Sequence, residues 1–353
     1  MSEQANVDCA AGFGVRLIGC ADDAALPIGM HDYAESLGCC MLVDKTMFIA
    51  DVLDCDASVV VCCRPEGFGK SMNLSMLKAF LERPAVGRSG QRLFAGAQIW
   101  DANSGRYRDE YACYPVISLD FSGAARCGAA VAGVVHNALS GECVRLLPLL
   151  EAPDLARDKV RHIERVARGA ASEDEVASVL GVLIELLEIA CDEQVVLLVD
   201  GYDAAWLGRA SARGASGADP AGLFDRVLFD AIVAARDSLR LTCLMGECPG
   251  PAEAALSLHG CSYCLTTPPS TWCDRCFGFS DAEVQTLLNH AGCGEYLDDA
   301  REWLEGYRFG RAYCSSPARV IGFLDRGCTA PVRADLYGYA DCLSRVVVGW
   351  NLD

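Results

Sequence analysis

Three consecutive residues, Gly69, Lys70 and Ser71, have the chemistry to bind a phosphate and a divalent cation. They form the second half of the phosphate-binding loop motif G-x-x-x-x-G-K-[ST], in which Arg64 stands at the position of the first glycine. In such a loop, backbone N–H groups surround a phosphate, the lysine ammonium contacts its outer oxygens, and the hydroxyl ligates magnesium. The triplet therefore predicts a phosphate site, with Lys70 at the phosphates and Ser71 at Mg²⁺.

The segments around this triplet have the patterns that would position it. Residues 58–63 are mostly β-branched or small and apolar, which predicts a buried strand, and Leu74, Leu77 and Leu81 recur at helical spacing after the loop. A second apolar run, residues 195–199, ends in Asp200, an acid that would hold magnesium through water. Short buried strands that alternate with helices predict an α/β fold, a P-loop NTPase with a mostly parallel sheet between helices.

Residues 64–82, RPEGFGKSMNLSMLKAFLE, resemble the signature of the predicted AAA-ATPase-like family, whose loop usually reads R-P-R-R-F-G-K-[ST]. Other segments resemble that family in the same order: LPIG at 26–29, LVDKT at 42–46, YPVISLDF at 114–121, VVLLVDGYD at 195–203, FGFSDAEV at 277–284 and WLEGYRFG at 303–310. The resemblance implies ATP and Mg²⁺ as ligands. It also implies that the nucleotide contacts come from the loop and its flanks, Arg64, Pro65, Glu66, Gly67, Phe68, Gly69, Lys70, Ser71 and Met72.

Within that loop, Arg64 and Pro65 match the family and would set the shape of the loop, whereas packing suffices to explain Phe68. Glu66 and Gly67 stand where the family has two arginines, so a negative charge replaces positive ones near the phosphates.

Two further positions bear on hydrolysis. The family's D-E-Y-D segment has a glutamate that would orient the attacking water, and this chain has Gly201 there. Related enzymes have a polar γ-phosphate sensor near the end of the next strand, where this chain has Met245. General-base assistance is typically worth 10²–10⁴-fold in rate. We therefore expect an ATP-binding protein whose hydrolysis is weak or absent.

Two carboxylates are candidates for the missing base, in addition to Lys70 and Asp200 as catalytic groups. Asp203 lies two residues beyond Gly201, but strand alternation would place its shorter carboxylate elsewhere. Glu247 follows the next strand and could reach the same water. The sequence leaves open whether either acts.

The chain has 21 cysteines, which we expect to be reduced thiols because the chain is long, has an odd count and lacks an export signal. Cys261 and Cys264 form one C-x-x-C pair, and Cys273 and Cys276 form another, a spacing compatible with a tetrahedral zinc site. A chain this rich in cysteine contains about one such pair by chance. Structural Zn²⁺ is therefore possible but not favoured.

Length, charge and hydropathy suggest the organisation of the chain and its partners. A chain of 353 residues suggests about two domains. From the pattern along the chain we expect a weakly ordered N-terminus at 1–25, a P-loop domain at 26–274 and a small helical domain at 275–353, which would act as a lid. The net charge of −18 disfavours direct nucleic-acid binding. Neither a membrane helix nor a secretory signal is apparent, which favours a cytoplasmic protein.

The resemblance raises one more expectation. Many family members carry a C-terminal nuclease-like domain of the restriction-endonuclease superfamily, and residues 321–353 are too short for it. Either the domain has been lost or the chain ends early, so we expect no nuclease activity. The alternative function is a degenerate P-loop scaffold that acts in protein interaction, possibly with a structural zinc. The protein partner and the oligomeric state stay open.

Overall fold

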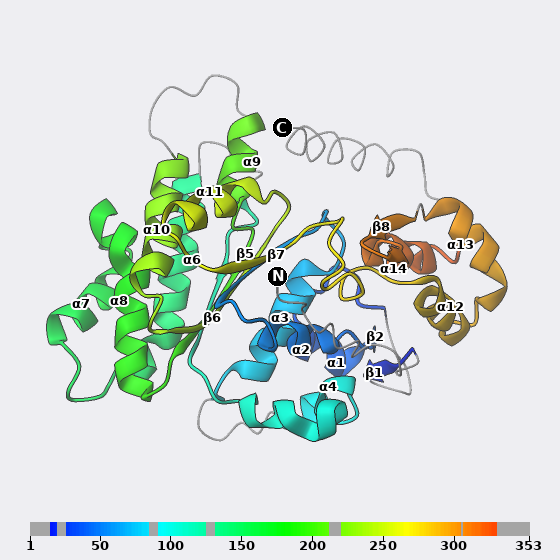
Figure 1. Cartoon of the computed structure of the whole chain (residues 1–353), viewed down its shortest axis with the longest axis horizontal. Coiled ribbons are helices and arrows are strands. Elements are labelled where there is room, and N and C mark those ends of the chain that lie inside the picture. The colour runs from blue at the N-terminus through cyan, green and yellow to red at the C-terminus, as the bar shows by residue number, and fades with distance from the viewer. Residues whose placement is uncertain are drawn as a thin grey trace, which may run out of the picture.

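The computed structural model describes residues 15–19, 26–84, 91–124, 131–211, 220–304 and 306–329. Its centre is a five-stranded sheet with the strand order β4-β5-β6-β3-β7, and all neighbouring strands are parallel (Figure 1). The strands are β3 (Val59–Cys63), β4 (Val116–Asp120), β5 (Val195–Asp200), β6 (Leu239–Gly246) and β7 (Tyr263–Thr266). The predicted α/β fold of a P-loop NTPase is confirmed.

Helices cover both faces of the sheet, which explains why the strand residues are apolar on both sides. Along β3, Val61 packs into one buried cluster and Val60 into the other, because successive side chains of a strand point to opposite faces. The first cluster contains side chains of α6 (Val131–Leu146), α7 (Arg157–Ala167), α8 (Glu173–Cys191), α10 (Pro220–Ala234) and α11 (Gly250–Leu258). The second contains side chains of α1 (Tyr33–Cys39), α2 (Met47–Leu53), α3 (Lys70–Leu81) and α4 (Gln98–Asp101).

The register of the central strands brings their carboxyl ends together. Cys63 of β3 is paired with Gly246 of β6, and Asp200 of β5 is paired with Met245 of the same strand β6. Ligands of parallel sheets bind at this edge, outside the carboxyl ends of the strands. The loop after β3, Asp200 and Glu247 therefore lie at one edge of the sheet, as the sequence predicts.

The C-terminal elements lie together, shown in gold to orange in Figure 1. They are α12 (Asp281–His290), α13 (Leu297–Trp303), β8 (Tyr307–Phe309), β9 (Ala312–Cys314) and α14 (Pro317–Asp325). The three helices form a third buried cluster that includes Val43, whereas Phe309 of β8 and Cys314 of β9 pack into the second cluster. Ser280 and Glu283 form the capping box of α12. The helices were expected, whereas the antiparallel pair β8 and β9 was not. Residues 330–353 of the expected helical domain lie outside the described residues.

The N-terminal segment also differs from the sequence expectation. Within the N-terminal segment that we expect to be weakly ordered, β1 (Leu17–Gly19) pairs antiparallel with β2 (Met41–Val43). The remaining short segments are α9 (Ala204–Ser211) and the 3-10 segments η1 (Gln91–Phe94), η2 (Ala102–Glu110), η4 (Leu147–Leu149) and η5 (Gly294–Tyr296). None of the helices described by the structure is both long and apolar enough to span a membrane.

Candidate nucleotide site

The loop between β3 and α3 owes its shape to two glycines. Gly67 has φ of +80° and Gly69, the N-cap of α3, has φ of +81°, a left-handed conformation that glycine adopts without steric cost. The first intrahelical bond that follows runs from Asn73 N to Gly69 O, at 2.9 Å. Lys70 and Ser71 therefore occupy the first turn of α3, where free N–H groups and the helix dipole favour an anion.

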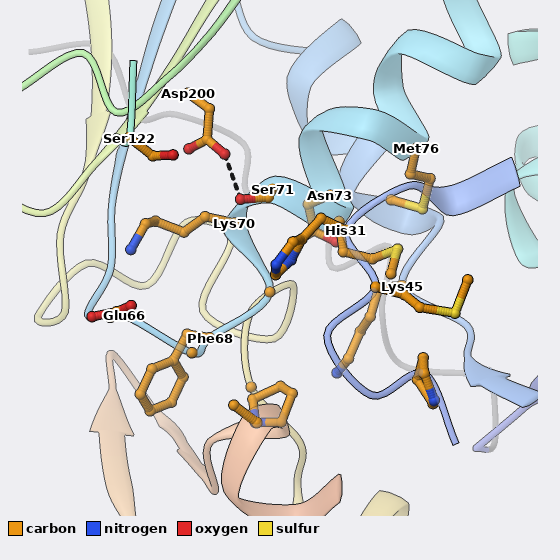
Figure 2. A pocket seen from close by; sticks show the side chains of 18 of the residues that line it. His31, Lys45, Glu66, Phe68, Lys70, Ser71, Asn73, Met76, Ser122 and Asp200 are labelled. Atoms are coloured by element: carbon orange, nitrogen blue, oxygen red, sulfur yellow. Dashed lines mark hydrogen bonds between the residues drawn. The ribbon is translucent and has the colours of Figure 1, made fainter. Parts of the chain in front are cut away.

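Lys70 is held over its own loop. Its ammonium donates to the carbonyl oxygens of Arg64, at 2.8 Å, and Pro65, at 3.0 Å. The Glu247 carboxylate lies 3.5 Å from the same nitrogen. These contacts keep a positive charge at the mouth of the loop, where Figure 2 shows Lys70 on the same side as Glu66.

Ser71 and Asp200 bring a hydroxyl and a carboxylate into direct contact. Ser71 Oγ donates a hydrogen bond to Asp200 Oδ2 (Figure 2). Asp200 is 8% exposed, and this burial raises the pKa of its carboxyl, with Ser71 and Lys70 partly offsetting the effect. Oxygen ligands of these two kinds are the ones that Mg²⁺ prefers.

A cavity of about 590 Å³ lies in front of the loop. The loop and the start of α3, residues 66–73, line one side of it, and the N-terminal segment at 27–31 lines another. Residues Pro317, Ala318 and Ile321 of α14 also reach it. The volume is in the range of small-molecule sites in proteins.

Gly201 has no room for a side chain. Its φ is +67°, and a Cβ at this position would lie 2.6 Å from the backbone nitrogen of Ser122. Met245 is fully buried, packs in the core on the α3 side of the sheet, and its carbonyl accepts N–H bonds from Gly201, at 2.8 Å, and Tyr202, at 3.2 Å. Neither position provides a polar side chain at the cavity.

Asp203 and Glu247 both line the cavity but differ in their surroundings. Asp203 is 1% exposed, and its Oδ2 accepts N–H bonds from Glu247, at 2.7 Å, and Cys248, at 2.6 Å. Burial raises the pKa of Asp203 to about 6, although these two bonds and Lys70 act in the opposite direction. The Asp203 carboxylate thus holds the turn after β6, whereas Glu247 contacts Lys70.

Arg64 does not lie where the resemblance implies. Its side chain is fully buried and does not line the cavity, and neither does Pro65. The guanidinium donates to Cys63 O and to Thr266 Oγ1, both at 2.8 Å, and stacks near two aromatic rings, with centroids at 5.0 Å for Phe277 and 4.9 Å for Phe309. The Arg64 side chain therefore links the loop to the C-terminal part of the chain, which fits the role in loop shape expected of it but not a side-chain contact with the nucleotide.

Phe68 is also directed away from solvent. It packs edge-on against Tyr307, at 4.8 Å between ring centroids, and Phe309, at 4.9 Å. This contact agrees with the packing role that the sequence suggests for Phe68. The residue also lines the cavity.

Ser316 and Ala318, which no sequence pattern singled out, hold the loop from the C-terminal side. Ser316 Oγ donates to the carbonyl of Gly67 at 3.0 Å, and Ala318 N donates to the same oxygen at 3.2 Å. Lys45, which lines the cavity, pairs with Glu283 of α12 at 2.7 Å. The matching segments at 42–46 and 277–284 were the only sequence signal that these distant elements meet.

The four cysteines of the two C-x-x-C pairs do not form one cluster. Cys273 and Cys276 lie beside Asp51, and their ligand atoms are within 4.8 Å of one another. Cys264 instead lies in β7, which pairs with β3, and neither it nor Cys261 belongs to that group. A four-cysteine zinc site, which the sequence allowed but did not favour, is therefore not formed, because strand pairing carries the first C-x-x-C pair to the edge of the sheet.

The family model described as "Predicted AAA-ATPase" matches residues 27–249. Neither the curated proteins nor the solved structures gave a significant match. The matched residues include the N-terminal side of the cavity, the phosphate-binding loop, Asp200 and Glu247. They cover more than half of the chain, which therefore belongs to the predicted AAA-ATPase family.

Proposed function

We propose that this protein binds ATP with Mg²⁺ at the loop and hydrolyses it slowly or not at all. The observation that carries the proposal is the contact between the Ser71 hydroxyl and the Asp200 carboxylate, next to Lys70 and at the N-terminus of α3. Membership of the family implies a nucleotide ligand. The local residues provide the three elements that a Mg²⁺-nucleotide needs, namely a cation, oxygen ligands and helix N–H groups.

The residues present fit such a ligand. Lys70 would exchange its hydrogen bonds with the Arg64 and Pro65 carbonyls for stronger, charge-assisted bonds to phosphate oxygens. Ser71 would ligate the ion directly and Asp200 would hold it through water. Bound magnesium would favour the ionised form of Asp200 against the effect of its burial.

The rest of the cavity would take the base and the sugar. Ile28, Met30 and Ile321 line it with apolar side chains, a surface suited to the face of a planar ring. His31 lies nearby among the lining residues, as Figure 2 shows. These residues do not select adenine over guanine, so the preference for ATP rests on the family.

Three local features argue for slow hydrolysis. Position 201 cannot carry a water-orienting side chain, the Asp203 carboxylate is engaged with two backbone N–H groups, and Glu247 lies against Lys70. A water molecule at the γ-phosphate would therefore lack a positioned base. Losing such a base typically costs 10²–10⁴-fold in rate.

The alternative is a P-loop scaffold that has lost nucleotide binding and acts only through a protein partner or through its own oligomer. The Glu247 carboxylate favours this alternative, because it lies 3.5 Å from the Lys70 ammonium and would compete with a phosphate for that charge. Equilibrium binding of ATP to the full chain, with Mg²⁺ and with a chelator, separates the two. Saturable binding that weakens without Mg²⁺ supports the proposal, and no binding of ATP, ADP or GTP would contradict it.

A further inference from the structure

A cluster of two thiols and one carboxylate lies beside the nucleotide cavity and has no part in the proposed nucleotide chemistry. Asp51 belongs to α2, whereas Cys273 and Cys276 belong to the turn that precedes α12. Cys276 Sγ donates to Asp51 Oδ2 at 3.0 Å. Cys273 is 4% exposed and Cys276 is 7% exposed, so both thiols are shielded from solvent.

The spacing of the three side chains suits a thiophilic metal ion. Their ligand atoms lie within 4.8 Å of one another. Two sulfur ligands of tetrahedral zinc are about 3.8 Å apart, as follows from Zn–S bonds of about 2.3 Å. Ligand atoms this close to one another can share a single ion. Thiolate ligands with a carboxylate select zinc over the hard ions calcium and magnesium, which prefer oxygen ligands alone.

The backbone of the turn is fixed by other parts of the chain, so the two thiols are preorganised. Asn73 Nδ2 donates to the Cys276 carbonyl at 2.9 Å, and Lys45 Nζ donates to the Arg275 carbonyl at 3.0 Å. Arg64 donates to the Cys273 carbonyl at 3.4 Å. Outer contacts of this kind orient the ligands of a metal site.

The electrostatic setting also fits a bound cation. Two thiolates and one carboxylate on a divalent ion have a net charge of −1, and Arg64, whose guanidinium donates to the Cys273 carbonyl, is a fully buried cation. Within the described residues, no carboxylate forms an ion pair with Arg64, and its Nε has no hydrogen-bond partner. A negatively charged cluster beside it would neutralise this buried charge.

We propose that Asp51, Cys273 and Cys276 bind one zinc ion, with the fourth tetrahedral position left to water. Cys276 also lines the nucleotide cavity, which gives the ion and the water a path to the site. The ion would join α2 to the turn whose carbonyls contact Arg64 and Asn73, and both of these residues lie next to or within the phosphate-binding segment. Zinc binding at this cluster does not require a bound nucleotide.

Metal analysis of the reduced, full-length protein tests this assignment. After dialysis against metal-free buffer, we expect about one zinc per chain in the wild type. The same content is expected in the Cys261→Ser/Cys264→Ser double variant, which removes the C-x-x-C pair outside the cluster. Asp51→Asn and Cys273→Ser/Cys276→Ser should lose the zinc. Retention of zinc by both of these variants, or its loss from the Cys261→Ser/Cys264→Ser protein, would overturn the assignment.

Two measurements on the wild type do not depend on whether the variants fold. Replacement of zinc by Co²⁺ should give thiolate-to-cobalt charge-transfer absorption. Alkylation followed by mass spectrometry should find Cys273 and Cys276 protected until a chelator is added. A reduced wild-type protein that binds neither zinc nor cobalt, or in which Cys273 and Cys276 are alkylated equally with and without the chelator, would refute the site.

Discussion

Gly201 lies so close to Ser122 that a Cβ atom at position 201 would be 2.6 Å from the Ser122 backbone nitrogen. The next two atoms nearest to this Cβ position are also backbone atoms, Ser122 Cα at 2.7 Å and Phe121 C at 3.0 Å. Backbone atoms cannot rotate away as a side chain can. The glutamate that the family has at this position is therefore excluded by the local backbone, and restoring it would require β4 and β5 to move apart at their ends.

We predict that Gly201→Ala lowers the free energy of unfolding by at least about 1 kcal/mol, because the left-handed conformation and the backbone overlap both oppose a side chain. Gly260→Ala is the matched control, since Gly260 has φ of +64° with nothing within 4 Å of its Cβ position. Urea unfolding followed by circular dichroism should rank Gly201→Ala as the more destabilised. Gly201→Glu should gain no ATP turnover, and a stable Gly201→Glu protein with faster turnover would refute this account.

The ionisation of Asp203 should make stability depend on pH. Its pKa is raised to about 6 in the folded protein, chiefly by burial, against about 3.9 for an unfolded aspartate. Between these values the folded state binds more protons than the unfolded state, so this group's contribution to stability is largest at low pH and is lost as pH rises through about 6.

The Asp203→Asn variant isolates that effect. An asparagine oxygen can still accept the N–H bonds of Glu247 and Cys248. The free energy of unfolding of the wild type relative to Asp203→Asn should fall by up to about 3 kcal/mol between about pH 4 and pH 7, since one pKa unit corresponds to about 1.4 kcal/mol. Urea unfolding across this range measures it. A difference that rises with pH would show that the Asp203 pKa is lowered instead.

Arg64 should act on stability more than on nucleotide affinity. Arg64→Lys removes the stacking on Phe277 and Phe309 and the planar set of donors, so it should lower the free energy of unfolding by about 2 kcal/mol or more. Arg308→Lys is the control, because Arg308 stacks on the exposed Tyr313 and should change stability little. If Arg64→Lys leaves stability unchanged and weakens ATP binding instead, the side chain contacts the nucleotide after all.

A variant of Glu247 can show whether this carboxylate competes with ATP for Lys70 or acts as the general base in hydrolysis. Glu247→Gln removes the negative charge 3.5 Å from Lys70 and should strengthen ATP binding by up to about fivefold, the effect expected of a partly exposed ion pair. Glu253→Gln makes the same charge change in α11, away from the cavity lining, and should have no effect. Single-turnover rates should match the wild type. A fall of about 100-fold or more in Glu247→Gln would identify Glu247 as the general base.

The sequence predicts best the features that local patterns determine. The strand at 59–63, the glycine turn and the leucine spacing after it are contiguous in the chain, so Lys70 and Ser71 could be assigned to the start of a helix. Asp200 could be added because it ends an apolar run of strand length, and the register with β6 places it at the same edge. These elements are specified by hydrophobic periodicity and turn chemistry.

The errors concern partners that are distant in the sequence. Arg64 was counted among the nucleotide contacts and as a residue that shapes the loop, yet its guanidinium bonds to Thr266, some two hundred positions away. The two C-x-x-C pairs look alike in the sequence, but one enters β7 and the other packs beside Asp51. Residue type and spacing do not show which distant elements pack together.

Calorimetric titration of ATP with Mg²⁺ into the wild type, Lys70→Ala and Lys78→Ala tests the central claim most directly. Lys78 lies in the last turn of the same helix and does not line the cavity, so its variant controls for the loss of a lysine from α3. The account predicts saturable binding to the wild type and Lys78→Ala, loss of binding in Lys70→Ala, and little or no single-turnover hydrolysis by any of them. Absence of binding by the wild type, or equal affinity in Lys70→Ala, would contradict a nucleotide site at this loop.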